Sequence, residues 1–143
     1  MTAQTRGGVA GPPAGSPPGR AADPRRRRAR QGEDAAAAAL RERGYRIVAR
    51  NVRLRRGELD IVADDRGTLV FVEVKTRRSR AYGTPAEAVT PAKQRALATL
   101  ALAYLARRGL HGRVCRFDVV EVWLDTADRV ARLEVLRDAF AAS

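Results

Sequence analysis

Two short apolar segments near the middle of the chain constrain its fold most strongly. Residues 57–63 read GELDIVA and residues 69–75 read LVFVEVK, and both are rich in Val, Ile or Phe. Five residues separate the two segments, and the first four of them, Asp64-Asp65-Arg66-Gly67, favour a turn. Runs of this kind on either side of a short polar turn predict two antiparallel strands joined as a hairpin.

Side chains alternate between the two faces of a strand, so residues 69–75 divide into two sets. The three valines form one face, which we expect to be buried. The other face begins with Leu69 and Phe71 and ends with Glu73 and Lys75, which lie about 7 Å apart along an extended strand. We therefore expect this charged pair at the rim of a core.

Asp60 lies on the preceding strand and faces Glu73 if the hairpin register sets them opposite each other. Two such carboxylates repel unless a cation lies between them. Oxygen ligands suit Mg²⁺ or Mn²⁺, and the Lys75 ammonium is suited to hold a water or to stabilise charge on a phosphoryl group. The pattern indicates metal-dependent phosphodiester hydrolysis, although the same residues also fit the solvated end of a half-exposed sheet.

Further short motifs follow one another in order from residue 32 to about residue 122. They are Gly32-Glu33, Gly44-Tyr45, Arg50-Asn51, Gly57-Glu58-Leu59-Asp60, Phe71-Val72-Glu73-Val74-Lys75, Tyr82-Gly83-Thr84-Pro85, Lys93 and Arg116-Phe117-Asp118. In these motifs the chain resembles the YraN family, small bacterial proteins with a restriction-endonuclease-like fold that are regarded as relatives of archaeal Holliday-junction resolvases. The resemblance implies an α/β fold with a mixed central sheet flanked by helices, in the order α-β-β-β-α-β.

The resemblance also implies roles for individual residues. Asp60 and Glu73 would bind the metal, with the backbone carbonyl of Val74 beside them, and Lys75 would be the catalytic lysine of a PD-(D/E)xK-type site. Leu59 stands where the name of that motif has proline. Two helix residues would support the site, namely Glu33 and Gln94. From the sequence alone, Glu33 is explained as a helix-end charge, and a helix-surface amide explains Gln94 as well as a site role does.

The chain is strongly basic. Its formal net charge is +12, from 28 basic and 16 acidic residues, which indicates a polyanionic partner or an anionic surface. We expect nucleic acid, with DNA favoured. Residues near the proposed site are candidates for phosphate contact, with solvated loops as the alternative: Arg55, Arg56, Arg77, Arg78, Arg80 and Lys93.

Composition excludes several kinds of protein. A single Cys115 and a single His111 exclude an intramolecular disulfide and a zinc site built from Cys and His, and we assign neither residue a function. No apolar run approaches the roughly 18 residues that cross a bilayer, so we expect a cytoplasmic protein without membrane attachment. Resolvase-like relatives act as two-fold dimers, which makes a homodimer an option, although no residue pattern here indicates one.

The expected organisation is one domain with two short ends. Residues 1–30 are predicted to be a disordered tail rich in Gly, Pro, Ala and Arg, which carries seven Arg and one Asp. Residues 31–137 would form the nuclease-like domain and residues 138–143 a frayed end. Helices are predicted over 33–43 and 91–108, and strands over 45–52, 116–123 and 130–136, with Asp118 as a structural charge.

The residue patterns and the resemblance to the YraN family together imply a metal-dependent endonuclease that acts on DNA, including structured or branched DNA. The alternative is a nucleic-acid-binding module of the same fold without catalysis. A third class is a basic scaffold that binds a protein or ribosomal RNA.

Overall fold

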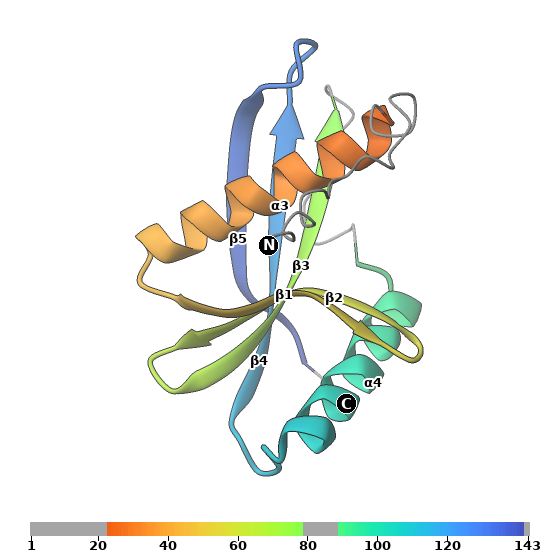
Figure 1. Cartoon of the computed structure of the whole chain (residues 1–143). Coiled ribbons are helices and arrows are strands. Elements are labelled where there is room, and N and C mark those ends of the chain that lie inside the picture. Colours follow the sequence, from red (N-terminus) through yellow and green to blue (C-terminus); the bar gives the residue numbers. More distant parts are fainter. Residues whose placement is uncertain (1–22, 79–88, 142–143) are drawn as a thin grey trace, which may run out of the picture.

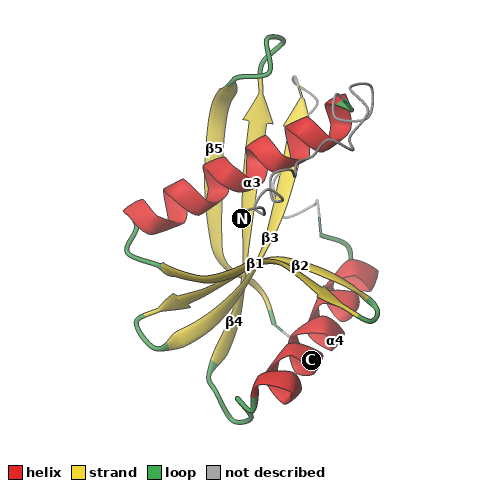
Figure 2. Cartoon of the chain, viewed as in Figure 1, coloured by secondary structure: helices red, strands yellow, loops and turns green. Residues whose placement is uncertain are grey.

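The computed structural model describes residues 23–78 and 89–141 and shows a mixed sheet with one helix on each face (Figure 1, Figure 2). The elements are α3 (Pro24–Glu42), β1 (Arg46–Leu54), β2 (Gly57–Asp65), β3 (Thr68–Arg78), α4 (Pro91–Arg108), β4 (Cys115–Leu124) and β5 (Val130–Phe140). The strand order is β1-β2-β3-β4-β5, and β3 and β4 pair in parallel while the other neighbours pair antiparallel. The predicted fold class and element order are confirmed, and the strand predicted over residues 130–136 is β5, at the edge of the sheet.

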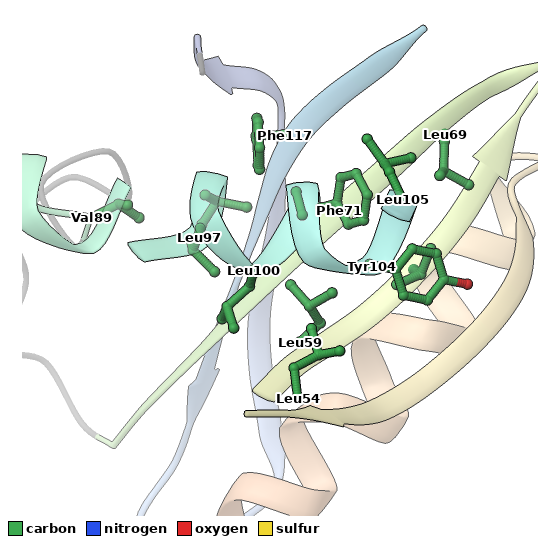
Figure 3. Close-up of a cluster of buried hydrophobic side chains, with 13 residues drawn as sticks. Leu54, Leu59, Leu69, Phe71, Val89, Leu97, Leu100, Tyr104, Leu105 and Phe117 are labelled. Carbon is green, nitrogen blue, oxygen red and sulfur yellow. The ribbon is translucent and has the colours of Figure 1, made fainter. Parts of the chain in front are cut away.

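Each face of the sheet is buried under one helix. On the α4 face, the rings of Phe71 and Tyr104 meet edge to face with their centroids 5.8 Å apart (Figure 3). Helix α3 covers the opposite face, which carries Val70 and Val72. The predicted alternation along β3 is therefore confirmed. This strand is apolar on both faces up to Val72, and Glu73 follows directly.

Helix α3 begins at Pro24, well before the predicted helix start at Glu33. Asp23 caps it, because the Asp23 side chain accepts a hydrogen bond from the Arg25 N–H at 3.0 Å and Pro24 occupies the first turn. The arginine run assigned to a disordered tail therefore forms helix, and the predicted boundary at residue 30 falls inside α3. Glu33 lies in the middle of the helix. Residues 1–22 of the predicted tail lie outside the described residues.

Gly32 allows α3 to lie directly against β3. A Cβ atom at Gly32 would stand 1.9 Å from Thr76 Oγ1, so a larger residue there would displace Thr76 or the helix. The next residue, Glu33, is thereby held near the sheet, where its charge reaches Asp60.

Helix α4 has the predicted ends. The Thr90 hydroxyl accepts a hydrogen bond from the Lys93 N–H at 3.1 Å, Pro91 occupies the first position, and Gly109 ends the helix with φ of 67°. These caps fix Lys93 in the first turn. Among the helices of the described ranges, none is long and apolar enough to cross a membrane.

Strand β5 runs to Phe140, beyond the predicted strand end at Leu136. The Phe140 ring stacks on Phe117 at a centroid distance of 4.8 Å, and the Asp138 N–H donates to Asp118 Oδ1 at 2.9 Å. Residues 138–140, predicted to be part of a frayed end, are therefore held on β4.

Candidate active site

The pairing of β2 with β3 ends one position before Asp60 and Glu73. Ile61 and Val72 are the last paired residues at this end, and the same register would set Asp60 opposite Glu73. Instead, Asp60 Oδ2 accepts a hydrogen bond from the Val74 N–H at 2.9 Å. A side chain thus bridges to the neighbouring backbone at the point where the two strands separate.

Both carboxylates are shielded from solvent. Glu73 is only 6% exposed, and Asp60 is half-buried. Burial raises the pKa of Asp60 to about 7, and the nearby carboxylates of Glu73 and Glu33 add to the rise, while the Val74 N–H and the Lys93 ammonium oppose it. Three carboxylates therefore share one neighbourhood, with Asp60 as their common neighbour.

Both lysines of the chain approach Glu73. Lys75 Nζ lies 3.8 Å from Glu73 Oε2, and Lys93 Nζ, from the first turn of α4, lies 3.5 Å from the same oxygen. These are the only two lysines in the sequence, and arginine occurs at every other position that carries one of these two residue types. An ammonium is compact and its pKa responds readily to its surroundings, which suits proton transfer in a way that a guanidinium does not.

Glu33 approaches the carboxylates from α3 and contacts β1. Burial raises the pKa of Glu33, while the Arg50 charge and a hydrogen bond from the Asn51 side chain lower it. Asn51 has φ of 51°, a left-handed conformation that is uncommon outside glycine and for which Asn is enriched. We assigned Asn51 no role from the sequence, and its one signal there was its place in the Arg50-Asn51 motif.

Gln94 does not join the carboxylates. Its side-chain amide donates to the Val89 carbonyl oxygen at 3.0 Å, and its backbone N–H donates to the Thr90 carbonyl oxygen at 2.8 Å. Both bonds secure the start of α4. The preceding residue, Lys93, is the one that reaches Glu73, so the contacts of Gln94 do not support its predicted place beside the metal.

The arginines predicted to contact phosphates differ in their surroundings. Arg55 and Arg56 are exposed in the turn between β1 and β2. Arg77 and Arg78 are each paired with a carboxylate, at 2.9 Å and 3.1 Å, so part of their charge is neutralised within the fold. Arg80 lies outside the described residues.

Glu121 is a buried carboxylate of β4 that we did not single out from the sequence. It pairs in register with Lys75 on β3 and accepts a hydrogen bond from Arg77 Nε at 2.9 Å. Burial raises its pKa, against the opposing charges of Arg77 and Lys75. The signal that could have revealed it is an acidic residue set between Val120 and Val122, in the apolar second half of the strand.

Asp60 and Glu73 suit a hard divalent cation. Burial is the main cause of the raised pKa of Asp60, and the neighbouring carboxylates add to it; a divalent cation bound between the carboxylates would offset that negative charge. Within residues 23–78 and 89–141, no group of three or more Asp, Glu, His or Cys side chains is placed to hold a metal by itself. Mg²⁺ in proteins often uses one or two carboxylates and takes its other ligands from water and substrate phosphate, and Asp60 and Glu73 provide two carboxylates.

The stability of the metal-free protein is expected to fall as the pH rises from about 4 to about 7. In the unfolded chain Asp60 loses its proton near pH 4, whereas in the folded protein it keeps the proton up to about pH 7. The folded state binds more protons in this window, so the free energy of unfolding decreases with rising pH. Thermal unfolding in EDTA at acidic and neutral pH should show a drop of a few degrees that is smaller in Asp60→Asn. Equal drops in the two proteins would contradict the raised pKa.

Residues 32–122 match the family described as Uncharacterised protein family UPF0102. The UPF0102 protein of Symbiobacterium thermophilum is 59% identical over 117 residues, which cover 82% of this chain and 98% of the relative. The UPF0102 protein of Moorella thermoacetica is 55% identical over 116 residues, 81% of this chain and 97% of the relative. That of Geobacter sulfurreducens is 52% identical over 110 residues, 77% and 85% of the two chains. The matched range contains every site residue described above, and the chain belongs to the UPF0102 family, the YraN family that its motifs resemble.

Proposed function

We propose that the protein is a metal-dependent endonuclease that hydrolyses phosphodiester bonds in nucleic acid, with DNA as the favoured substrate. The observation that carries this proposal is the meeting of Asp60, Glu73 and the two lysines of the chain where β2 and β3 separate. The net charge of +12 supports a polyanionic substrate.

Each residue of the site has a role in this proposal. Asp60, Glu73 and the backbone carbonyl of Val74 would hold Mg²⁺ or Mn²⁺, an ion that supplies Lewis-acid polarisation of a phosphate oxygen. Lys75 would orient the attacking water and assist its deprotonation. Lys93, on α4, approaches the same Glu73 carboxylate as Lys75 does from β3. From this position its ammonium would offset negative charge that develops on the phosphoryl group.

Glu33 adds a third negative charge from α3. Its carboxylate acts on Asp60 electrostatically, and it is held by the Asn51 side chain. In the proposed enzyme it would strengthen the attraction of the site for a divalent cation without completing a cage of protein ligands.

The test is a set of labelled four-way junction, flap, nicked, duplex and single-stranded DNAs, incubated with Mg²⁺, with Mn²⁺ or with EDTA. The proposal predicts cutting of at least one substrate only when the metal is present. Binding to these DNAs without cutting would favour the non-catalytic binding module instead. Tight association without regard to DNA structure would favour a basic scaffold.

A further inference from the structure

A cleft of about 620 Å³ is lined by residues of the first half of α3 and of strands β1 and β2. Figure 1 shows where these elements lie. Arg26 and Arg30 line it from α3, and Arg50 and Arg53 line it from β1. We call it the arginine cleft. Glu33 lines it too, so the cleft shares a residue with the carboxylate site.

The arginines on α3 are not explained by helix stability. Residues 25–28 are all arginine, and the first turn of α3 contains no acidic residue, although the positive end of a helix dipole favours acids. Within the described ranges, the guanidinium groups of Arg26, Arg30 and Arg53 make no ion pair or hydrogen bond. These guanidinium groups are exposed to solvent and have no partner within the described residues, so they are available to an external anion.

Arg50 provides an independent indication of a ligand. Its Nη2 lies 2.8 Å from Asp34 Oδ1, but its Nε is buried and has no hydrogen-bond acceptor in the described part of the chain. A buried donor on a charged group is costly to leave unpaired. An oxygen of an anion bound in the arginine cleft would satisfy it once the partly exposed Arg50 side chain shifts to uncover the atom.

We infer that the arginine cleft binds the sugar–phosphate backbone of a single-stranded segment of nucleic acid beside the carboxylate site. This inference rests on the proposed function, since the bound strand would belong to the nuclease substrate. A volume of about 620 Å³ lies within the range of small-molecule sites, which is room for a few nucleotides of one strand and not for a whole duplex. No aromatic side chain is among the described residues that line the cleft, so the contacts are to phosphates and independent of base sequence.

One acidic residue that lines the arginine cleft predicts the direction in which a change of charge alters strand binding. Asp34 is paired with Arg50, whereas Glu58 is exposed and has no ion pair or hydrogen bond within residues 23–78 and 89–141. Glu58 therefore repels the anion that the arginines attract. Removing its charge strengthens strand binding, while reversing the charge of cleft arginines weakens it.

The experiment measures binding of a short labelled oligo-dT and of a matched duplex to the full-length protein in EDTA, where no cutting occurs. Arg26→Glu/Arg30→Glu is expected to lower affinity for the single strand about tenfold or more and to make the slope of log affinity against log salt shallower by about 1.4. Arg41→Glu/Arg107→Glu makes the same charge change in the last turns of α3 and α4, and it is expected to lower affinity less than about threefold.

Thermal unfolding of both variants checks their folding. Arg26→Glu places a glutamate in the first turn of α3, at the favourable end of the helix dipole, and Arg30→Glu lies one turn later; the cleft variant is expected to unfold no earlier than the control variant. Should the cleft variant fail to fold, Arg53→Glu and Glu58→Gln provide the same test at exposed positions. The first should weaken and the second strengthen binding of the single strand.

Equal losses in the cleft and control variants would overturn the inference, and so would a loss confined to the duplex. A wild-type protein that binds strands through the cleft but cuts nothing with Mg²⁺ would overturn the proposed nuclease and leave the cleft standing. A protein that cuts DNA, with cleft and control variants that bind alike, would overturn the cleft alone.

Discussion

The substitution Asp60→Asn is expected to lower metal-dependent cleavage by about 10³-fold or more while leaving nucleic-acid binding intact. Asparagine keeps an oxygen that can accept the Val74 N–H, so the link between β2 and β3 survives. The change removes the charge that would hold a divalent cation, and losses of this size follow when stabilisation of transition-state charge is removed. Single-turnover cleavage and binding in EDTA measure the two effects separately.

The matched control is Asp64→Asn, at the other end of the same strand. Asp64 accepts a hydrogen bond from the Gly67 N–H at 2.9 Å and lies 3.1 Å from Arg113, away from the carboxylate cluster. Its cleavage rate should stay within about twofold of wild type, because a surface ion pair contributes little. The proposal would be contradicted if both variants lost activity equally, or if Asp60→Asn still cut DNA at the wild-type rate.

The substitution Asp118→Ala is expected to lower the free energy of unfolding by about 3–5 kcal/mol. Asp118 is fully buried, and its carboxylate accepts hydrogen bonds from Tyr45 Oη at 2.7 Å, from Arg116 at 2.9 Å and 3.0 Å, and from the Asp138 N–H at 2.9 Å. Alanine would leave these donors short of acceptors in a mostly buried location. Urea unfolding at neutral pH measures the loss.

Glu134→Ala is the control for this change. Glu134 pairs with Arg132 at a partly exposed position of β5, so its removal should cost less than about 1 kcal/mol. Equal effects of Asp118→Ala and Glu134→Ala would show that the network around Asp118 does not stabilise the fold.

Asp118 and Asp60 show how a structural and a candidate functional carboxylate differ in this protein. Asp118 has four donors around it, and the pKa of Arg116 is raised, chiefly by its hydrogen bonds to Asp118. Asp60 has one backbone donor and faces the carboxylates of Glu73 and Glu33. The charge of Asp118 is compensated by donors within the fold, whereas a cation bound from outside would be needed to compensate the charge around Asp60.

Local patterns predicted those parts of the fold that local physics determines. The alternation of Val70, Phe71 and Val72 follows from the pleat of a strand buried on both faces. The ends of α4 follow from Thr90 and Gly109, whose capping chemistry acts within a few residues of the chain.

The start of α3 was not predicted because the arginine-rich composition of this segment was given more weight than its helix-capping signal. The dipeptide Asp23-Pro24 is a helix-start signal, but the arginines that follow resemble a solvated tail when no partner is visible. Their place on a helix that crosses the sheet depends on Gly32 and Thr76, which are far apart in the chain. A similar limit applies to Gln94, because the direction of its amide is set by the loop before α4.

The position of Glu121 beside Lys75 also could not be derived locally. It depends on the parallel register between β3 and β4, two strands that α4 separates in the sequence. The approach of Lys93 to Glu73 depends on the same crossover. The sequence therefore predicts the candidate ligands Asp60 and Glu73, whereas tertiary structure determines which groups surround them.

Calorimetric titration of the metal-free protein with Mn²⁺ at neutral pH tests the central claim most directly, which is that Asp60 and Glu73 share a divalent cation. The account predicts one saturable site per chain, release of protons on binding because the cation lowers the raised pKa of Asp60, and loss of the site in both Asp60→Asn and Glu73→Gln. Absence of saturable binding in the wild type, or an unchanged site in Asp60→Asn, would contradict it.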